Sequence, residues 1–167
     1  MKFSTSGHEN TNSPSVNVIM KRITSENIDT LKAIDPNIDV KKPFLEQKHG
    51  RCEAFGLWSD SDEPLAYVWL MYKGGHYAWW SLMNIDAWIT GVFVGERYRR
   101  KGCCEYMIHR VLNYLKSEKN IDEAYLSVRI RNYPARNAYK KLGGTEIAHK
   151  KIFRICRIQI PFHGYTL

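Results

Sequence analysis

The residues with the clearest chemical potential form a basic loop directly ahead of a helical segment. Arg99-Arg100-Lys101-Gly102-Cys103-Cys104 places three cations and a glycine before residues 103–119. A helix N-terminus presents unpaired backbone N–H groups and a partial positive charge, and both favour an anion. Gly102 has no Cβ, so a phosphate can approach the backbone closely there. The loop is therefore a candidate phosphate site, although a solvent-exposed basic turn has the same composition.

The charge distribution agrees with an anionic ligand but does not identify it. Residues 1–95 hold 9 Lys and Arg against 11 Asp and Glu, whereas residues 96–167 hold 16 against 6. Such a basic half suggests a polyanion, either a nucleic acid or a phosphorylated cofactor. The loop matches neither GxxxxGK[ST] nor GxGxxG, so two common nucleotide-binding motifs are excluded.

The elements that position this loop follow from hydrophobic periodicity. Residues 85–94 are apolar and β-branched, which predicts a buried central strand ahead of the loop. Residues 103–119 have apolar side chains along one helical face. A short buried strand over 124–128 and a helix over 134–142 follow, the helix with a proline in its first turn. The strands at 85–94 and 124–128 can then run parallel in a β-α-β unit.

The remaining segments complete a mixed sheet. Strands are expected at 16–22, 54–58, 65–72, 145–151 and 153–160. A helix is expected from Thr24 or Ser25 to Ile34, before Pro36, and a shorter one over 41–48. The predicted order is β-α-α-β-β-β-α-β-α-β-β, an antiparallel meander followed by the β-α-β unit.

Length and composition predict one globular domain. The chain has 167 residues, 44% of them hydrophobic. Residues 1–15 are polar and predict a loose tail, with the domain over 16–167. No apolar run reaches the roughly 18–20 residues that cross a bilayer, and no signal peptide is evident, so a cytoplasmic location is expected. The four cysteines lack metal-site spacing, so reduced thiols and no metal are expected.

The loop, together with a second motif, resembles the GNAT superfamily of N-acetyltransferases. The first signature of that family is [Q/R]-x-x-G-x-[G/A] between a central strand and a helix, where this chain has residues 99–104. The second is an Asn, then a small residue, then a Tyr seven positions after the Asn, matched by Asn132, Ala135 and Tyr139. Cys104 replaces the usual Gly or Ala, which should perturb packing rather than abolish binding. The resemblance covers roughly residues 16–160.

The resemblance implies both the fold and the cofactor. The implied fold is a single α/β (α+β) domain: a mixed, mostly antiparallel central sheet, a β-α-β cofactor unit, and helices on both faces. The implied cofactor is acetyl-CoA, with its pantetheine arm along residues 92–94 and near Asn132. Backbone amides of residues 99–104 would hold its pyrophosphate. The implied cofactor-binding set is Val92, Phe93, Val94, Arg99, Arg100, Lys101, Gly102, Cys103, Cys104, Asn132 and Tyr139.

Acetyl transfer to an amine sets the chemical requirements. The amine must be neutral, the thioester carbonyl polarised and the leaving thiolate protonated. The resemblance places Tyr139 near the thioester sulfur, and a tyrosine is still protonated at neutral pH. Because a free alkylamine has a pKa near ~10, a base is also needed. Residues 88–94 contain no acid, so Asp86 is the predicted base; Glu96, His76 and a water chain are the alternatives.

The acceptor is the least determined part of the prediction. Trp79, Trp80 and Trp88 flank or begin the central strand and could bind an ammonium by cation–π contact, or simply pack in the core. The expected function is acetylation of a primary amine on a small molecule, by a monomer or homodimer without nucleic-acid or membrane partners. The alternatives are a protein N-terminal or lysine acetyltransferase, a non-catalytic acetyl-CoA sensor, and a nucleic-acid binder.

Overall fold

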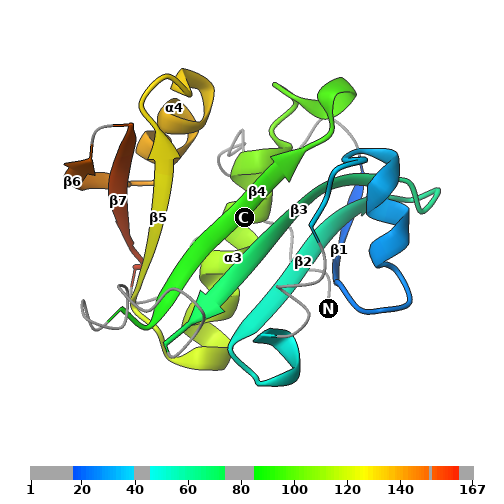
Figure 1. The fold of residues 1–167 in the computed structure, drawn as a ribbon, viewed down its shortest axis with the longest axis horizontal. Coiled ribbons are helices and arrows are strands. Elements are labelled where there is room, and N and C mark those ends of the chain that lie inside the picture. Colours follow the sequence, from blue (N-terminus) through cyan, green and yellow to red (C-terminus); the bar gives the residue numbers. More distant parts are fainter. Residues whose placement is uncertain (1–16, 40–45, 74–84, 151, 162–167) are drawn as a thin grey trace, which may run out of the picture.

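A computed structural model describes residues 17–39, 46–73, 85–150 and 152–161. Seven strands form one sheet in the order β1-β2-β3-β4-β5-β7-β6 (Figure 1). They are β1 (Val18–Arg22), β2 (Cys52–Ser59), β3 (Pro64–Tyr72), β4 (Ala87–Val94), β5 (Glu123–Arg129), β6 (Thr145–Lys150) and β7 (Phe153–Gln159). The helical elements are η1 (Ile28–Ala33), η2 (Glu96–Tyr98), α3 (Cys103–Lys119) and α4 (Tyr133–Lys141). The predicted tail, most of the predicted helix over 41–48, and Trp79 and Trp80 lie outside the described residues.

The pairing confirms the predicted fold class. β4 and β5 run parallel, and every other neighbouring pair of strands is antiparallel. One prediction is wrong in detail: the segment from Thr24 to Ile34 forms a 3₁₀ helix that begins only at Ile28. The Thr24 N–H donates to the Asn27 side chain, whose amide donates to the Arg22 carbonyl. These bonds hold residues 24–27 as a turn and delay the helix.

The two faces of the sheet carry different elements. α3 and α4 lie on one face, where their buried side chains share a core with residues of β2, β3 and β4. η1 lies on the opposite face and packs on β3 (Figure 1). Side chains of β3 alternate accordingly: Val68 and Leu70 face α3, while Tyr67, Trp69 and Met71 face η1.

A bulge in β4 changes which face its side chains occupy. Tyr67 pairs with Phe93 and Trp69 pairs with Thr90. Between these pairs β3 covers two residue steps, whereas β4 covers three. Gly91 lies inside this bulge with φ +56°, a conformation that glycine adopts without a Cβ penalty. Because of the extra residue, Trp88 and Phe93 face the same side although an odd number of positions separates them. The bulge therefore turns the Phe93 ring toward the η1 face.

β4 and β5 pair only near their beginnings. The recorded partners are Trp88 with Tyr125 and Ile89 with Leu126, although β4 continues to Val94 and β5 to Arg129. Figure 1 shows the two strands diverging beyond this point. On the β5-facing edge of residues 90–94, the backbone N–H and C=O groups consequently have no partner in the described sheet. Apart from the Val94 carbonyl, which accepts from Arg99, they are available to an extended ligand.

A buried carboxylate anchors the far end of α3. Glu53 on β2 accepts hydrogen bonds from Arg22, Tyr72, Tyr114 and Lys119, with the Arg22 Nη1 at 2.8 Å and the Tyr114 hydroxyl at 2.8 Å from its oxygens. Burial would raise the pKa of Glu53, but the hydrogen bonds from both tyrosines and the two cationic charges outweigh burial and lower it. The network ties α3 to three strands and so fixes the helix whose N-terminus carries the basic loop.

Replacing Glu53 by Gln should destabilise the fold by about 2 kcal/mol at pH 7, because the cations and tyrosines lose their charged partner. The lowered pKa means that this contribution is present above the unfolded-state value near ~4.3 and is lost as the pH falls through the folded value. Urea unfolding of Glu53→Gln and wild type should therefore converge in acid. Asp62→Asn, which loses an exposed ion pair with Lys21, is the control and should change stability little. Equal stability of Glu53→Gln and wild type at pH 7 would contradict the anchoring role.

Candidate active site

The basic loop forms a tight turn at the start of α3. Arg100 and Gly102 have φ values of 62° and 80°, so two left-handed residues flank Lys101. Such turns can bring successive backbone N–H groups to one concave side, which suits an anion. Gly102 is the N-cap of the 17-residue helix and has no side chain to accept from the first amides of α3. No side chain of the N-cap residue therefore caps these amides.

The side chains of the loop are exposed and positively charged. Arg99 donates from Nε to the Val94 carbonyl at 3.2 Å, which ties the loop to the end of β4. The Lys101 ammonium lies 5.6 Å from the centre of the Tyr98 ring, and Tyr98 is buried. Within the described ranges, none of Arg99, Arg100 and Lys101 forms an ion pair. Their charge is not neutralised by the fold and can act on phosphates.

The loop and the diverging strands are at the same end of the sheet. β4 ends at Val94, and residues 95–102 lead directly to α3. An extended ligand on the free edge of residues 92–94 can therefore reach the α3 N-terminus with an anionic group. The residues fit a phosphorylated, extended molecule such as coenzyme A, because they offer backbone groups on β4 that lack strand partners, helix amides and unneutralised cations.

Tyr139 is buried next to this end of α3. Its side chain is 6% exposed and belongs to the core beneath α3. Burial, and after it the Cys104 and Cys156 thiols, raises the pKa of Tyr139 above its usual value, so the hydroxyl remains protonated. Among the described residues the hydroxyl has no hydrogen-bond partner, and its oxygen is not one of the fully enclosed polar atoms. It is free to donate a proton.

Asn132 and the cysteines have structural surroundings. The Asn132 side chain accepts from the Ala135 N–H at 3.3 Å and so caps α4, the helix that carries Tyr139. Its contact with pantetheine is still a prediction. Cys103 is buried in the core, while Cys104 is half-buried, with burial raising the pKa of its thiol to about 11. All four cysteines are free thiols.

The candidate base is not brought to the loop. Asp86 is exposed in the turn before β4, and the eight residues of β4 separate it from the loop by about 26 Å at ~3.3 Å per residue. Glu96 lies exposed at the other end of β4, in η2. His76 is outside the described residues. The structure thus groups the loop and Tyr139 but leaves Asp86 apart from them.

The predicted aromatic acceptor site is only partly described. Trp88 is 2% exposed and stacks on Tyr125 with ring centroids 6.3 Å apart. Another aromatic group, missed from the sequence, lies further along β4, where Phe93 stacks on Tyr67. The Tyr67 hydroxyl donates to Asp35, 32 residues earlier, and no local pattern in the sequence indicates that contact.

Comparison with known proteins agrees with the two motifs. A model described as the acetyltransferase (GNAT) family matches residues 21–144. An N-alpha-acetyltransferase of Sulfurisphaera tokodaii is 39% identical over 59 residues, which are 35% of this chain and 35% of that protein. A putative [ribosomal protein bS18]-alanine N-acetyltransferase of Bacillus subtilis is 33% identical over 86 residues, 49% of this chain and 56% of that protein. The chain thus spans between about a third and just over half of these relatives' lengths.

The fold also has solved neighbours. A spermidine N-acetyltransferase from Vibrio cholerae, solved in complex with CoA and spermine, has a TM-score of 0.66 and 15% identity. The match covers 90% of this chain and 96% of that chain, and at this identity it concerns the fold alone. In the described part of the chain, no helix is both long and apolar enough to span a membrane. Since the family model covers most of the chain and the fold agrees with it, this protein belongs to the acetyltransferase (GNAT) family.

Proposed function

We propose that this chain transfers the acetyl group of acetyl-CoA to a primary amine of a small molecule. The observation that carries the proposal is the position of Tyr139. Its hydroxyl is buried and protonated, and it lies beside the first turn of α3, the helix that follows the basic loop. A phosphate site alone would serve many ligands. A proton donor adjacent to it, at the end where β4 and β5 diverge, suits a reaction that releases a thiolate.

Acetyl-CoA, when bound, supplies the activated acetyl thioester. The amides of residues 99–104 and the charges of Arg99 and Lys101 bind its phosphates, and the free edge of residues 92–94 orients the pantetheine arm. The amine nitrogen forms a bond to the acetyl carbon as the carbon–sulfur bond breaks. Tyr139 donates its hydroxyl proton to the leaving sulfur and regains a proton from solvent, so that the products are an N-acetyl amine and free CoA.

The attacking amine must also lose a proton when its nitrogen bonds to the acetyl carbon. We assign this proton to water, which carries it to bulk solvent. The eight residues of β4 that separate Asp86 from the loop rule out direct contact between Asp86 and an amine near Tyr139.

A second candidate acceptor is the N-terminal amine of a protein. The relatives from Sulfurisphaera tokodaii and Bacillus subtilis are named for that activity, at 39% and 33% identity. Their matched segments leave much of each protein uncompared, so the acceptor site is not carried over with the name.

Thiol release from acetyl-CoA tests the proposal. The purified chain would be assayed against a panel of alkylamines and diamines and, separately, peptides with free N-termini, and the acetylated products identified by mass spectrometry. Faster turnover of small amines supports the proposal, and faster turnover of peptides favours the second candidate. No CoA release with any amine, despite measurable acetyl-CoA binding, would overturn the proposal in favour of a cofactor sensor.

A further inference from the structure

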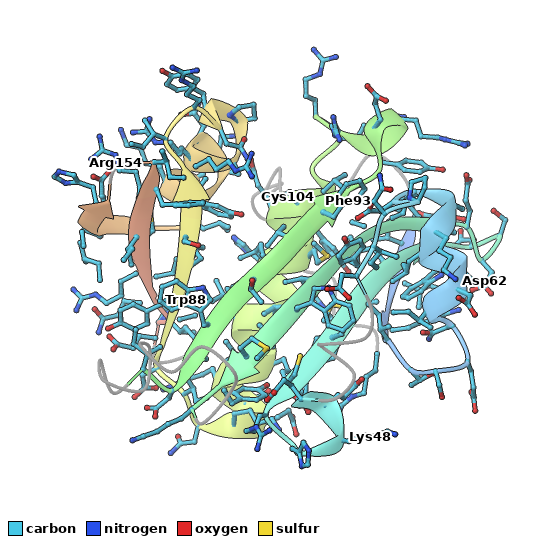
Figure 2. All side chains as sticks on the ribbon, in the orientation of Figure 1. Lys48, Asp62, Trp88, Phe93, Cys104 and Arg154 are labelled. Carbon is cyan, nitrogen blue, oxygen red and sulfur yellow. The ribbon has the colours of Figure 1, made fainter. Side chains whose placement is uncertain are left out.

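Among the described residues, the two faces of the sheet at the candidate site differ in what covers them. α3 and α4 cover one face of the sheet at the candidate site, and the side chains of Val92 and Val94 pack against that core. The Phe93 side chain belongs to the opposite face, because the Gly91 bulge turns it there. Figure 2 labels Phe93 and Cys104 near this end of β4. An amine that reaches a thioester on β4 from the η1 face therefore passes the Phe93 ring.

Phe93 is part of a stacked aromatic pair. Its Cα partner on β3 is Tyr67, and the two rings lie 5.4 Å apart between centroids with an interplanar angle of 11°. Tyr67 is buried, while Phe93 is only half-buried and keeps part of its ring accessible. The π face of an aromatic ring attracts a cation, most strongly where water is partly excluded.

A carboxylate completes the group. Asp35, just beyond η1, accepts from the Tyr67 hydroxyl at 2.6 Å and from the Asn37 N–H at 3.2 Å. These two bonds fix the orientation of the carboxylate. Burial, and then the bond to Asp35, raises the pKa of Tyr67, so its hydroxyl stays a neutral donor.

The charge of Asp35 is not balanced by the described part of the fold. The buried carboxylates Glu46 and Glu53 each form an ion pair with an arginine, Arg51 and Arg22 respectively. No Lys or Arg in the described ranges pairs with Asp35, which is half-buried. Removing a carboxylate partly from water without a cation is unfavourable, so a cationic ligand would be stabilised there.

We propose that Asp35, with the Tyr67–Phe93 pair, binds a second cationic group of the acceptor, so that the preferred substrate is a diamine rather than a monoamine. This inference rests on the proposed function. The two nitrogens have opposite requirements: the attacking amine must be neutral, whereas an ammonium held by a carboxylate and an aromatic face stays protonated. One nitrogen cannot satisfy both, so the group at Asp35 is separate from the one acetylated.

The test compares matched amines, 1-aminobutane with 1,4-diaminobutane, and the same pairs with three and five carbons. Wild type should show a kcat/KM about tenfold higher for the best diamine than for its monoamine, the order expected for one ammonium bound by a carboxylate and a ring. Asp35→Asn, which keeps an acceptor for Tyr67, should remove this preference through KM and leave monoamine turnover unchanged. Asp29→Asn, in η1 and paired with Lys32, is the control and should change neither.

Calorimetric binding of 1,4-diaminobutane in the presence of CoA gives a second readout that does not need turnover. Weaker binding to Asp35→Asn than to wild type supports the site even if no acetylation is detected. Equal kcat/KM for diamine and monoamine in wild type, or an equal loss for both in Asp35→Asn, would overturn it. Absence of CoA release with every amine, together with Asp35-dependent diamine binding, would count against the proposed function alone.

Discussion

Tyr139→Phe is expected to lower kcat about a hundredfold, the order that a positioned general acid contributes, while the Kd for acetyl-CoA stays unchanged. The substitution removes only the hydroxyl, and the ring that packs beneath α3 remains. Since the hydroxyl has no hydrogen-bond partner in the described residues, its removal leaves no polar group unpaired. The leaving sulfur, however, loses its proton donor. Steady-state CoA release at saturating amine, with calorimetry for the Kd, measures the two effects separately.

The matched control is Tyr133→Phe on the same helix. Tyr133 begins α4 and is 61% exposed, so loss of its hydroxyl should alter neither kcat nor stability. Thermal unfolding of both variants excludes a general effect on α4. A kcat for Tyr139→Phe equal to that of wild type across saturating amine would show that the proton reaches the sulfur from elsewhere, and Tyr139 would then be a packing residue.

Secondary structure was predicted well where local signals are strong. The sequence places α3 at residues 103–119, as observed, because a glycine before the helix and one apolar face mark it unambiguously. The first helix was placed too early, because capping-type residues such as Thr24 also form turns through their own side chains, here by accepting from the Glu26 N–H. The Gly91 bulge was not predicted, although an isolated glycine inside an apolar strand run is the local signal that indicates one.

The residues of the candidate site were likewise predicted where a local motif marks them and missed where none does. The basic loop and Tyr139 belong to short motifs, and the fold brings them together because the β-α-β unit places α3 and α4 on one face. Asp35 and Tyr67 have no motif, and their contact depends on η1 packing over β3. Trp88 was considered for substrate binding from its position alone, yet it is almost fully buried. Composition cannot distinguish a core tryptophan from one that lines a site.

Arg99→Glu combined with Lys101→Glu is expected to raise the Kd for acetyl-CoA at least about a hundredfold. Each reversal replaces an attraction by a repulsion, worth about 2 kcal/mol near ~4 Å in a water-like dielectric, and roughly 3 kcal/mol for both after screening gives that factor. Because the phosphates are not part of the reacting group, kcat at saturating cofactor should change little. Calorimetry at two salt concentrations measures the effect, which should shrink as salt rises.

Two further variants separate charge from structure at the loop. Arg99 also donates to the Val94 carbonyl, so its replacement removes a hydrogen bond that holds the loop to β4. The Lys101 ammonium lies over the Tyr98 ring and makes no such bond in the described part of the chain. Lys101→Glu alone therefore tests the effect of charge while the Arg99–Val94 hydrogen bond is kept. Lys48→Glu makes the same charge change at the opposite end of the sheet, where Figure 2 labels it, and should leave the Kd unchanged. An unaltered Kd for Lys101→Glu and for the double variant would exclude the pyrophosphate from this loop. A loss shared by Lys48→Glu would instead indicate an effect of net charge on association, because long-range attraction acts on cofactor wherever the cation lies.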